Sequence, residues 1–144
     1  MPREKSAGAI IFRKEQGETY YLLLRYRSGH WEFPKGHVEA QESDPDTVKR
    51  EVKEETGITN IEILQNFKEN IHYFYKLNNE LMSKDVVFYL VKSRTKEVKL
   101  SFEHIGFAWV SYEKAMEKLT YKNAKDILKK AHEFLKANKS LDDF

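Results

Sequence analysis

The sequence contains no cysteine, which excludes disulfide bonds, zinc–thiolate sites and thiol nucleophiles. Three prolines and six glycines among 144 residues leave no place for a long flexible linker. No apolar run approaches the roughly 18 residues that a membrane-spanning helix needs. The polar segment Met1–Ser6 also lacks the apolar stretch of a secretion signal. These absences predict a cytoplasmic protein without a membrane partner.

An excess of charge of one sign is also missing, because 25 Lys and Arg residues nearly balance 23 Asp and Glu residues. Without a strongly basic surface, the chain is not expected to bind long nucleic acids. What is present is a globular composition, with 40% hydrophobic and 33% charged residues. We therefore expect residues 1–144 to form a single domain, with fraying at Leu141–Phe144. No long apolar seam is evident, so a monomer is expected.

Most of the predicted strands are rich in β-branched, aromatic and leucine residues. Ala7–Phe12 and Tyr20–Tyr26 are separated by the turn-like Glu15–Glu18 and are predicted to form a hairpin. Val86–Val91 is apolar on both faces, which is typical of a central strand. The remaining predicted strands are Trp31–Phe33, Ile61–Leu64, Phe67–Lys76 and Ile105–Val110.

Helical signals occur in three places. Asp44–Pro45 is expected to begin a helix, with Asp44 as its N-cap, and Gly57 is expected to end it. Ser111 is expected to cap a short helix ending near Leu119, and apolar residues recur at helical spacing over Asn123–Ala137. The order of strands, helix, strands and helices predicts an α/β fold with a mixed or mainly antiparallel sheet.

One motif lies between Gly36 and Ile58. Five residues separate Gly36 from Glu42, and seven more separate Glu42 from the run REVKEETGI at positions 50–58. On a helix, the three glutamates of this run fall within about a third of the circumference. The glutamates are Glu51, Glu54 and Glu55.

Carboxylates at this spacing repel each other and destabilise a bare helix. Divalent cations prefer oxygen ligands, relieve the repulsion and keep coordination positions for phosphate. The adjoining stripe of Val48 and Val52 is expected to pack on the sheet. The pattern therefore predicts a metal–phosphate site. The alternative is a plain solvated helix face, with Arg50 in a surface ion pair of little energy.

The glycine, arginine and glutamates at this spacing match the box that defines the Nudix hydrolases, and the chain resembles that family. The resemblance implies an α/β/α sandwich with a central mixed sheet, in which the box forms a loop–helix–loop. It implies hydrolysis of a nucleoside diphosphate linked to another group, by attack of an activated water on phosphorus. Arg50 would orient a box glutamate, Glu42 would brace the loop, and Glu51 is a candidate base. Mg²⁺, or alternatively Mn²⁺, would be held by the Gly36 carbonyl, Glu51, Glu54 and Glu55.

Segments outside the box resemble one branch of this family, the asymmetric diadenosine tetraphosphate hydrolases. Trp31–Glu39 is similar to that branch's Trp-x-x-Pro-Lys-Gly-His-Val-Glu, and Leu100–His104 to its Leu-Ser-x-Glu-His. The resemblance implies cleavage of diadenosine tetraphosphate to ATP and AMP. Alternatives within the fold are a housecleaning phosphatase of the 8-oxo-dGTP type and an RNA 5′-pyrophosphohydrolase. A non-catalytic nucleotide-sensing module is a further alternative, although such modules usually lack box glutamates.

The branch resemblance implies roles for residues outside the helix. Glu103 would be a distal catalytic glutamate, acting as a base or a further metal ligand. Tyr73 and Tyr121 would hold an adenine ring between them, since stacking is worth about 1–3 kcal/mol per base. Each tyrosine has a structural alternative, as a sheet aromatic or a helix-packing residue. The residues implied in polyphosphate contacts are Tyr26, His30, Lys35 and Lys84.

The chain departs from the branch in three places. Phe33 stands where the branch commonly has proline, and Ala40–Gln41 stands where it has a Pro-Gly pair. Tyr75–Ser83 is longer than the compact linker of the animal members. The entrance to the substrate pocket is therefore expected to differ.

Overall fold

A computed structural model describes residues 2–138 of the chain, and the predicted fraying at Leu141–Phe144 lies outside them. Seven strands form one sheet in the order β3-β2-β1-β6-β5, with β4 paired to β1 and β7 paired to β2. The β1–β6 pair is parallel, whereas β1–β2 and β5–β6 are antiparallel, so the sheet is mixed as predicted. The strands are β1 (Arg3–Glu15), β2 (Glu18–Tyr26), β3 (Trp31–Glu32), β4 (Lys35–His37), β5 (Ile61–Leu77), β6 (Glu80–Ser93) and β7 (His104–Val110).

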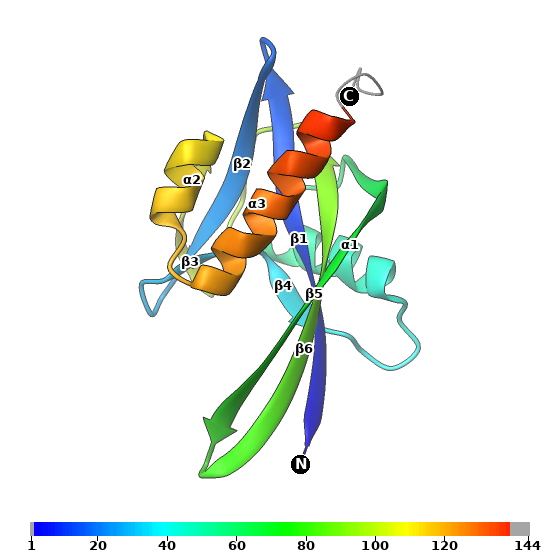
Figure 1. The fold of residues 1–144 in the computed structure, drawn as a ribbon, viewed down its shortest axis with the longest axis vertical. Coiled ribbons are helices and arrows are strands. Elements are labelled where there is room, and N and C mark those ends of the chain that lie inside the picture. Colours follow the sequence, from blue (N-terminus) through cyan, green and yellow to red (C-terminus); the bar gives the residue numbers. More distant parts are fainter. Residues whose placement is uncertain (1, 139–144) are drawn as a thin grey trace.

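Helices cover both faces of the sheet (Figure 1). They are α1 (Asp44–Thr56), α2 (Tyr112–Lys118) and α3 (Lys122–Ala137). The helix α1 lies on one face, and α2 and α3 lie on the other. This arrangement confirms the expected α/β/α sandwich. None of the helices in the described part of the chain is long and apolar enough to cross a membrane.

Each face of the sheet has its own apolar core because successive strand residues point to opposite sides. In β1, Ile10 and Phe12 pack beneath α2 and α3, whereas Ala9 and Ile11 pack beneath α1. The predicted anchors of α1, Val48 and Val52, are fully buried in the second core. The apolar stripe therefore fixes α1 to the sheet and leaves its acidic edge at the rim.

Two hairpin turns take the form that a twisted sheet favours. Gln16 and Gly17 have φ of 51° and 82°, and Asn78 and Asn79 have φ of 51° and 65°. Two successive residues with positive φ form the type I′ turn, which matches the right-handed twist of the flanking strands. The first of these turns confirms the turn predicted at Glu15–Glu18.

Several strand limits differ from the prediction: β6 begins at Glu80, six residues before the predicted start, and β4 was not predicted. β1 starts at Arg3, before the first predicted residue, because its polar beginning pairs with β4 and β6. The two predicted strands Ile61–Leu64 and Phe67–Lys76 form one strand. Its register shifts between Ile63 and Lys68, where Asn66 has φ of 71°.

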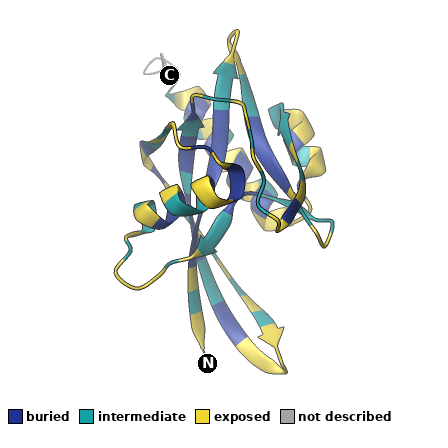
Figure 2. Cartoon of the chain, turned by 180° about the vertical axis from the view of Figure 1, so that it is seen from behind, coloured by how far each residue is buried: buried dark blue, intermediate teal, exposed yellow. Residues whose placement is uncertain are grey.

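The sheet extends beyond the helices at one end (Figure 1). The β5–β6 arm, defined here as residues 72–85, and the beginning of β1 form this extension, and Figure 2 shows exposed residues gathered at its tip. At the root of the arm, Tyr73 pairs with Lys84 across β5 and β6. Lys84 in turn pairs with Glu4 of β1. The arm therefore begins at two of the predicted substrate residues.

Candidate active site

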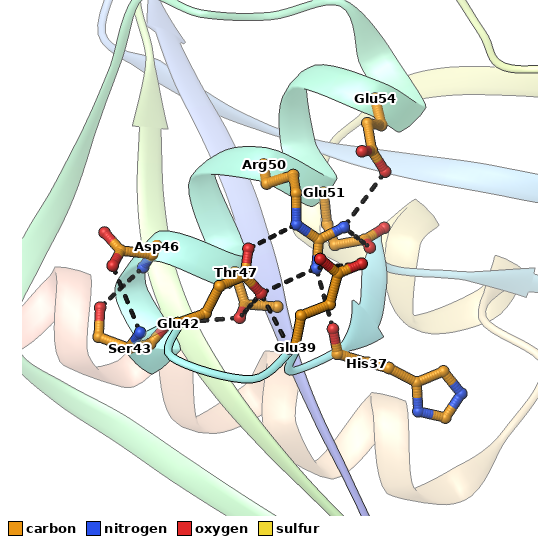
Figure 3. Close-up of polar contacts among 9 residues, drawn as sticks. All are labelled: His37, Glu39, Glu42, Ser43, Asp46, Thr47, Arg50, Glu51 and Glu54. Atoms are coloured by element: carbon orange, nitrogen blue, oxygen red, sulfur yellow. Dashed lines mark hydrogen bonds and ion pairs between the residues drawn. The ribbon is translucent and has the colours of Figure 1, made fainter.

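The N-cap of α1 lies one residue before the predicted position. Ser43, rather than Asp44, is the N-cap, because its extended backbone lets its hydroxyl accept from Asp46 N at 3.2 Å. The Asp46 carboxylate accepts from Ser43 N at 3.3 Å, which completes a capping box (Figure 3). Gly57 ends the helix as predicted, with φ of 75° in the left-handed region.

Arg50 joins the helix to the loop before it (Figure 3). Its guanidinium donates to both oxygens of Glu42, at 2.6 and 3.0 Å, and to His37 O at 2.9 Å. The same group lies 2.7 Å from Glu51 Oε1 and 3.4 Å from Glu54 Oε2. Hydrogen bonds from Arg50 lower the pKa of Glu42 to about 2. One planar cation thus contacts the loop and two of the predicted metal ligands.

Glu42 also binds groups other than Arg50. Its Oε1 accepts from Glu39 N at 3.0 Å and from Thr47 Oγ1 at 2.8 Å. Glu42 N donates to Glu39 O at 3.0 Å, which closes a turn with Gln41 at φ of 70°. A positive φ at the third residue alone defines a type II turn, which favours Pro-Gly at its centre. The backbone therefore keeps this turn although Ala40–Gln41 replaces the branch's Pro-Gly.

Gly36 leaves space that the carboxylate of Glu51 occupies. A Cβ atom added at Gly36 would lie 2.0 Å from Glu51 Cδ, which is far inside contact distance. Gly36 is on β4, which pairs with β1 through Ala7. The glycine of the motif is therefore needed here for close approach and not for a positive φ.

Two glutamates of α1 sit in a poorly solvated environment. Burial raises the pKa of Glu51 to about 7, and interaction with the Glu55 carboxyl adds to the shift. Burial also raises the pKa of Glu55 to about 7, and the negative charge of Glu103 adds to it. Glu55 is 3% exposed, and its Oε2 has no hydrogen-bond partner. Its Oε1 lies 3.1 Å from His104 Nε2.

Four of the five predicted catalytic residues, all except Glu55, line a cavity of about 410 Å³, here called the catalytic cavity. Glu54 is largely exposed at its rim, whereas Glu55 is buried behind it. Within residues 2–138, no three acidic or histidine side chains are already gathered as a finished metal centre. The predicted residues that line the cavity are Tyr26, Lys35, Gly36, Arg50, Glu51, Glu54, Lys84 and Glu103.

A second cavity of about 380 Å³, here called the nucleoside cavity, adjoins the first at Lys35. Tyr73 of β5 and Tyr121 before α3 both line it, and its floor includes Phe33 and Phe88. The two predicted base-binding tyrosines are thus brought together, although 48 residues separate them in the sequence. Phe33, which stands where the branch commonly has proline, packs in the core with 1% of its surface exposed.

His30 does not line either cavity and supports the wall between them. Its ring stacks on Tyr26 at 4.6 Å between centroids, and its Nε2 lies 2.8 Å from Glu32 Oε2. The other Glu32 oxygen accepts from Lys35 Nζ at 2.9 Å. In this structure His30 thus contacts a neighbouring carboxylate and ring, and its predicted contact with the polyphosphate stays a prediction.

Two residues of the site were not predicted. Glu32 holds His30 and Lys35, but nothing in the sequence distinguishes it from an ordinary strand acid. His104 is buried beside Glu55, and its Nδ1 lies 3.1 Å from Ser101 Oγ. Burial lowers the pKa of His104. The signal for His104 was present, since it ends the Leu-Ser-x-Glu-His segment.

A mixed sheet between helices, with a carboxylate-bearing helix beside a cavity of about 410 Å³, fits the class of Nudix hydrolases that the motif at residues 36–58 predicts. The model of the NUDIX domain matches residues 2–131, and the chain therefore belongs to the Nudix family. Like other members of this family, it is expected to work with a divalent metal ion.

Its relatives narrow the class further. The chain is 34% identical over 143 residues to the asymmetrical bis(5′-nucleosyl)-tetraphosphatase of Mus musculus, covering 91% of this chain and 95% of that protein. It is 35% identical over 136 residues to the Caenorhabditis elegans enzyme of the same name, covering 91% and 96%. The crystal structure of a C. elegans Ap4A hydrolase binary complex superposes with a TM-score of 0.82 at 33% identity, covering 93% of this chain and 98% of that one.

Proposed function

We propose that this protein hydrolyses diadenosine tetraphosphate (Ap4A) asymmetrically to ATP and AMP, by attack of water on phosphorus. The observation that carries the proposal is the pair of adjoining cavities that share Lys35. One has aromatic walls suited to a base, and the other has the acids and cations that suit a polyphosphate. The asymmetrical tetraphosphatases to which the chain is similar support the same substrate.

The nucleoside cavity would bind one adenosine between Tyr73 and Tyr121. Both rings are partly accessible, with Tyr121 50% exposed, so a base can cover them without unfolding the core. Burial raises the pKa of Tyr73, which keeps its hydroxyl neutral beside phosphate. Stacking between two rings holds the base tightly but reads its identity weakly.

The phosphate chain would run from Lys35 into the catalytic cavity. Lys84 lies across from Tyr73 in the sheet, and burial lowers its pKa, with the positive charge of Lys35 adding to the effect. Two lysines close enough to repel each other gain from an anion placed between them. Tyr26 completes this wall, with its hydroxyl 3.5 Å from Glu55 Oε1.

The residues present fit a divalent cation. Glu55 Oε2 is a buried oxygen without a partner, and burial raises the pKa of both Glu51 and Glu55, so an added cation would relieve the cost of ionising them. We propose Mg²⁺, with Mn²⁺ able to replace it, held by the Gly36 carbonyl, Glu51, Glu54, Glu55 and Glu103. When bound, the ion would polarise a phosphoryl oxygen and favour ionisation of water.

The protein's own groups would supply positioning and proton transfer. Glu51 and Glu103 are the proposed acceptors of the water proton, since both line the catalytic cavity. Arg50 would hold Glu51 in place through its 2.7 Å contact, and Glu42 would hold Arg50. Because the attacking group is water, no covalent intermediate on the protein is required.

A substrate panel tests the proposal. We expect Mg²⁺-dependent turnover of Ap4A to ATP and AMP to exceed that of 8-oxo-dGTP and of 5′-triphosphate RNA. Faster turnover of 8-oxo-dGTP or of 5′-triphosphate RNA would show that this compound, and not Ap4A, is the preferred substrate. Hydrolysis in ¹⁸O-labelled water would place the label in one product only and so identify the phosphorus attacked.

The proposal extends to the state of the protein in the cell. We propose that it acts as a cytoplasmic monomer, consistent with a chain that has no cysteine to oxidise. Analytical ultracentrifugation at protein concentrations that support activity tests the monomer. A measured mass twice that of one chain would contradict it.

A further inference from the structure

The wall of the site continues past the carboxylates to a turn with no assigned role. Ring contacts join Tyr121 to His30 at 5.6 Å, His30 to Tyr26 at 4.6 Å, and Tyr26 to His104 at 4.4 Å. His104 follows Glu103, which lines the catalytic cavity. This chain of rings starts at the nucleoside cavity and ends at the turn formed by residues 101–104. The turn is therefore connected to the nucleoside cavity by a continuous row of ring contacts.

Phe102 is in this turn and is 80% exposed, the highest fraction among the exposed large hydrophobic side chains of residues 2–138. A single exposed apolar residue is common and does not by itself indicate a site. Here, however, the ring is adjacent in sequence to Glu103, whose carboxylate borders the catalytic cavity. Phe102 is thus an exposed aromatic residue that directly precedes a residue lining the catalytic cavity.

Several hydrogen bonds hold the turn that carries Phe102. Arg27 N donates to Glu103 O at 3.3 Å, and Arg27 Nε donates to Phe102 O. Ser101 N donates to Glu55 O at 3.4 Å, and His104 N donates to Ser101 O at 3.2 Å. A backbone fixed from two sides presents the ring with little freedom left to lose on binding.

We propose that Phe102 is the stacking platform for the second nucleoside of the substrate. The inference rests on the proposed function, because only a dinucleoside polyphosphate has this second group. With one base between Tyr73 and Tyr121 and the phosphates at Lys35 and the carboxylates, the chain continues toward Glu103. The far nucleoside then meets the turn, where one ring face binds any base. Arg27 is a positioning residue that holds this turn.

The test compares two substrates that share the tetraphosphate but differ in the far nucleoside, namely Ap4A and adenosine 5′-tetraphosphate. For Phe102→Ala we expect the KM for Ap4A to rise at least about fivefold, the factor that corresponds to the lower end of the energy range for base stacking. The KM for adenosine 5′-tetraphosphate should stay at the wild-type value. Phe102→Trp should retain the wild-type KM for both substrates.

Phe107→Ala is the matched control, because Phe107 is another exposed aromatic, 42% exposed, on β7. It should leave both KM values unchanged. An equal change for the two substrates in Phe102→Ala, or no change in either, overturns the inference while leaving the proposed function in place. Failure of the wild-type protein to hydrolyse Ap4A overturns the proposed function, and the inference with it.

Discussion

At the scale of single residues, the site depends on close contacts that one added methyl group would break. In Gly36→Ala the new Cβ would displace the Glu51 carboxylate, because the two would be 2.0 Å apart. A displacement of about 1 Å in a catalytic group costs on the order of 100-fold in rate. We expect kcat to fall by about this factor, with little change in the thermal unfolding midpoint because a flexible side chain can move.

Gly106→Ala is the control for this substitution. A Cβ at Gly106 meets only Arg25 Cβ at 3.8 Å, an ordinary contact, and Gly106 has no positive φ. It should keep wild-type kcat. Wild-type kcat in Gly36→Ala would show that Glu51 needs no fixed position.

The buried Glu55 provides a second test at this scale. In Glu55→Gln the side chain keeps its shape but loses the charge that a divalent ion needs, so we expect Mg²⁺-dependent kcat to fall at least about 100-fold. Glu62→Gln, which alters an exposed ion pair with Arg94, is the control and should be neutral. Full Mg²⁺-dependent turnover by Glu55→Gln would make the metal assignment wrong.

The two raised carboxyl pKa values also predict how stability depends on pH. The folded-state values of about 7 for Glu51 and Glu55 exceed the ordinary 4.5, so the folded protein binds more protons between these limits. Their contribution to stability is complete below 4.5 and is lost as the pH rises through 7. Glu42, lowered to about 2, acts in the opposite sense, and its contribution is lost as the pH falls through 2.

We therefore expect the thermal unfolding midpoint of the metal-free protein to decrease between about pH 5 and pH 8. Added Mg²⁺ should recover more stability at about pH 8 than at pH 5, since its ligands must be deprotonated. Glu55→Gln, which lacks one of the two titrations, should show a shallower decrease. A midpoint of the metal-free protein that rises over this range would contradict the burial of the pair.

At the scale of elements, the loop before α1 keeps a turn whose preferred residues are absent. Gln41 has φ of 70° in the type II turn that begins at Glu39. A non-glycine residue in this region costs roughly 1–2 kcal/mol, part of which glycine recovers. We expect Gln41→Gly to raise the free energy of unfolding by about 0.5–1 kcal/mol in urea denaturation. Ala40→Gly, at a position of negative φ, should lower it instead.

Local signals predicted most elements correctly, and the errors lie where distant residues decide. Gly57 and Ser111 act within one turn of their helices, so their roles could be predicted from neighbouring residues. The parallel pairing of β1 with β6 leaves no local pattern, because its partners are about 80 residues apart. Glu32 was missed for the same reason, since its importance comes from where Lys35 and His30 converge.

At the scale of the whole molecule, the sheet has a covered body and a β5–β6 arm that extends beyond the helices. Local opening is easier where few apolar contacts are buried. We expect backbone amides near Asn78 to exchange with deuterium within seconds to minutes, and those of Leu22–Leu24 to be among the slowest. A non-hydrolysable Ap4A analogue should slow exchange at Tyr73 and Lys84 but not at Asn78. Uniform protection along the arm would contradict this division.

The parallel β1–β6 pair has a consequence for the order in which the protein is made. Residues 3–12 leave the ribosome before their partners at 83–92, which follow about 80 residues later. Until then, Ile10 and Ile11 are part of an apolar strand with one unpaired side, which is the kind of edge that attracts other chains. Synthesis that stalls before β6 would therefore release an aggregation-prone fragment, although such a fragment already contains the whole of α1.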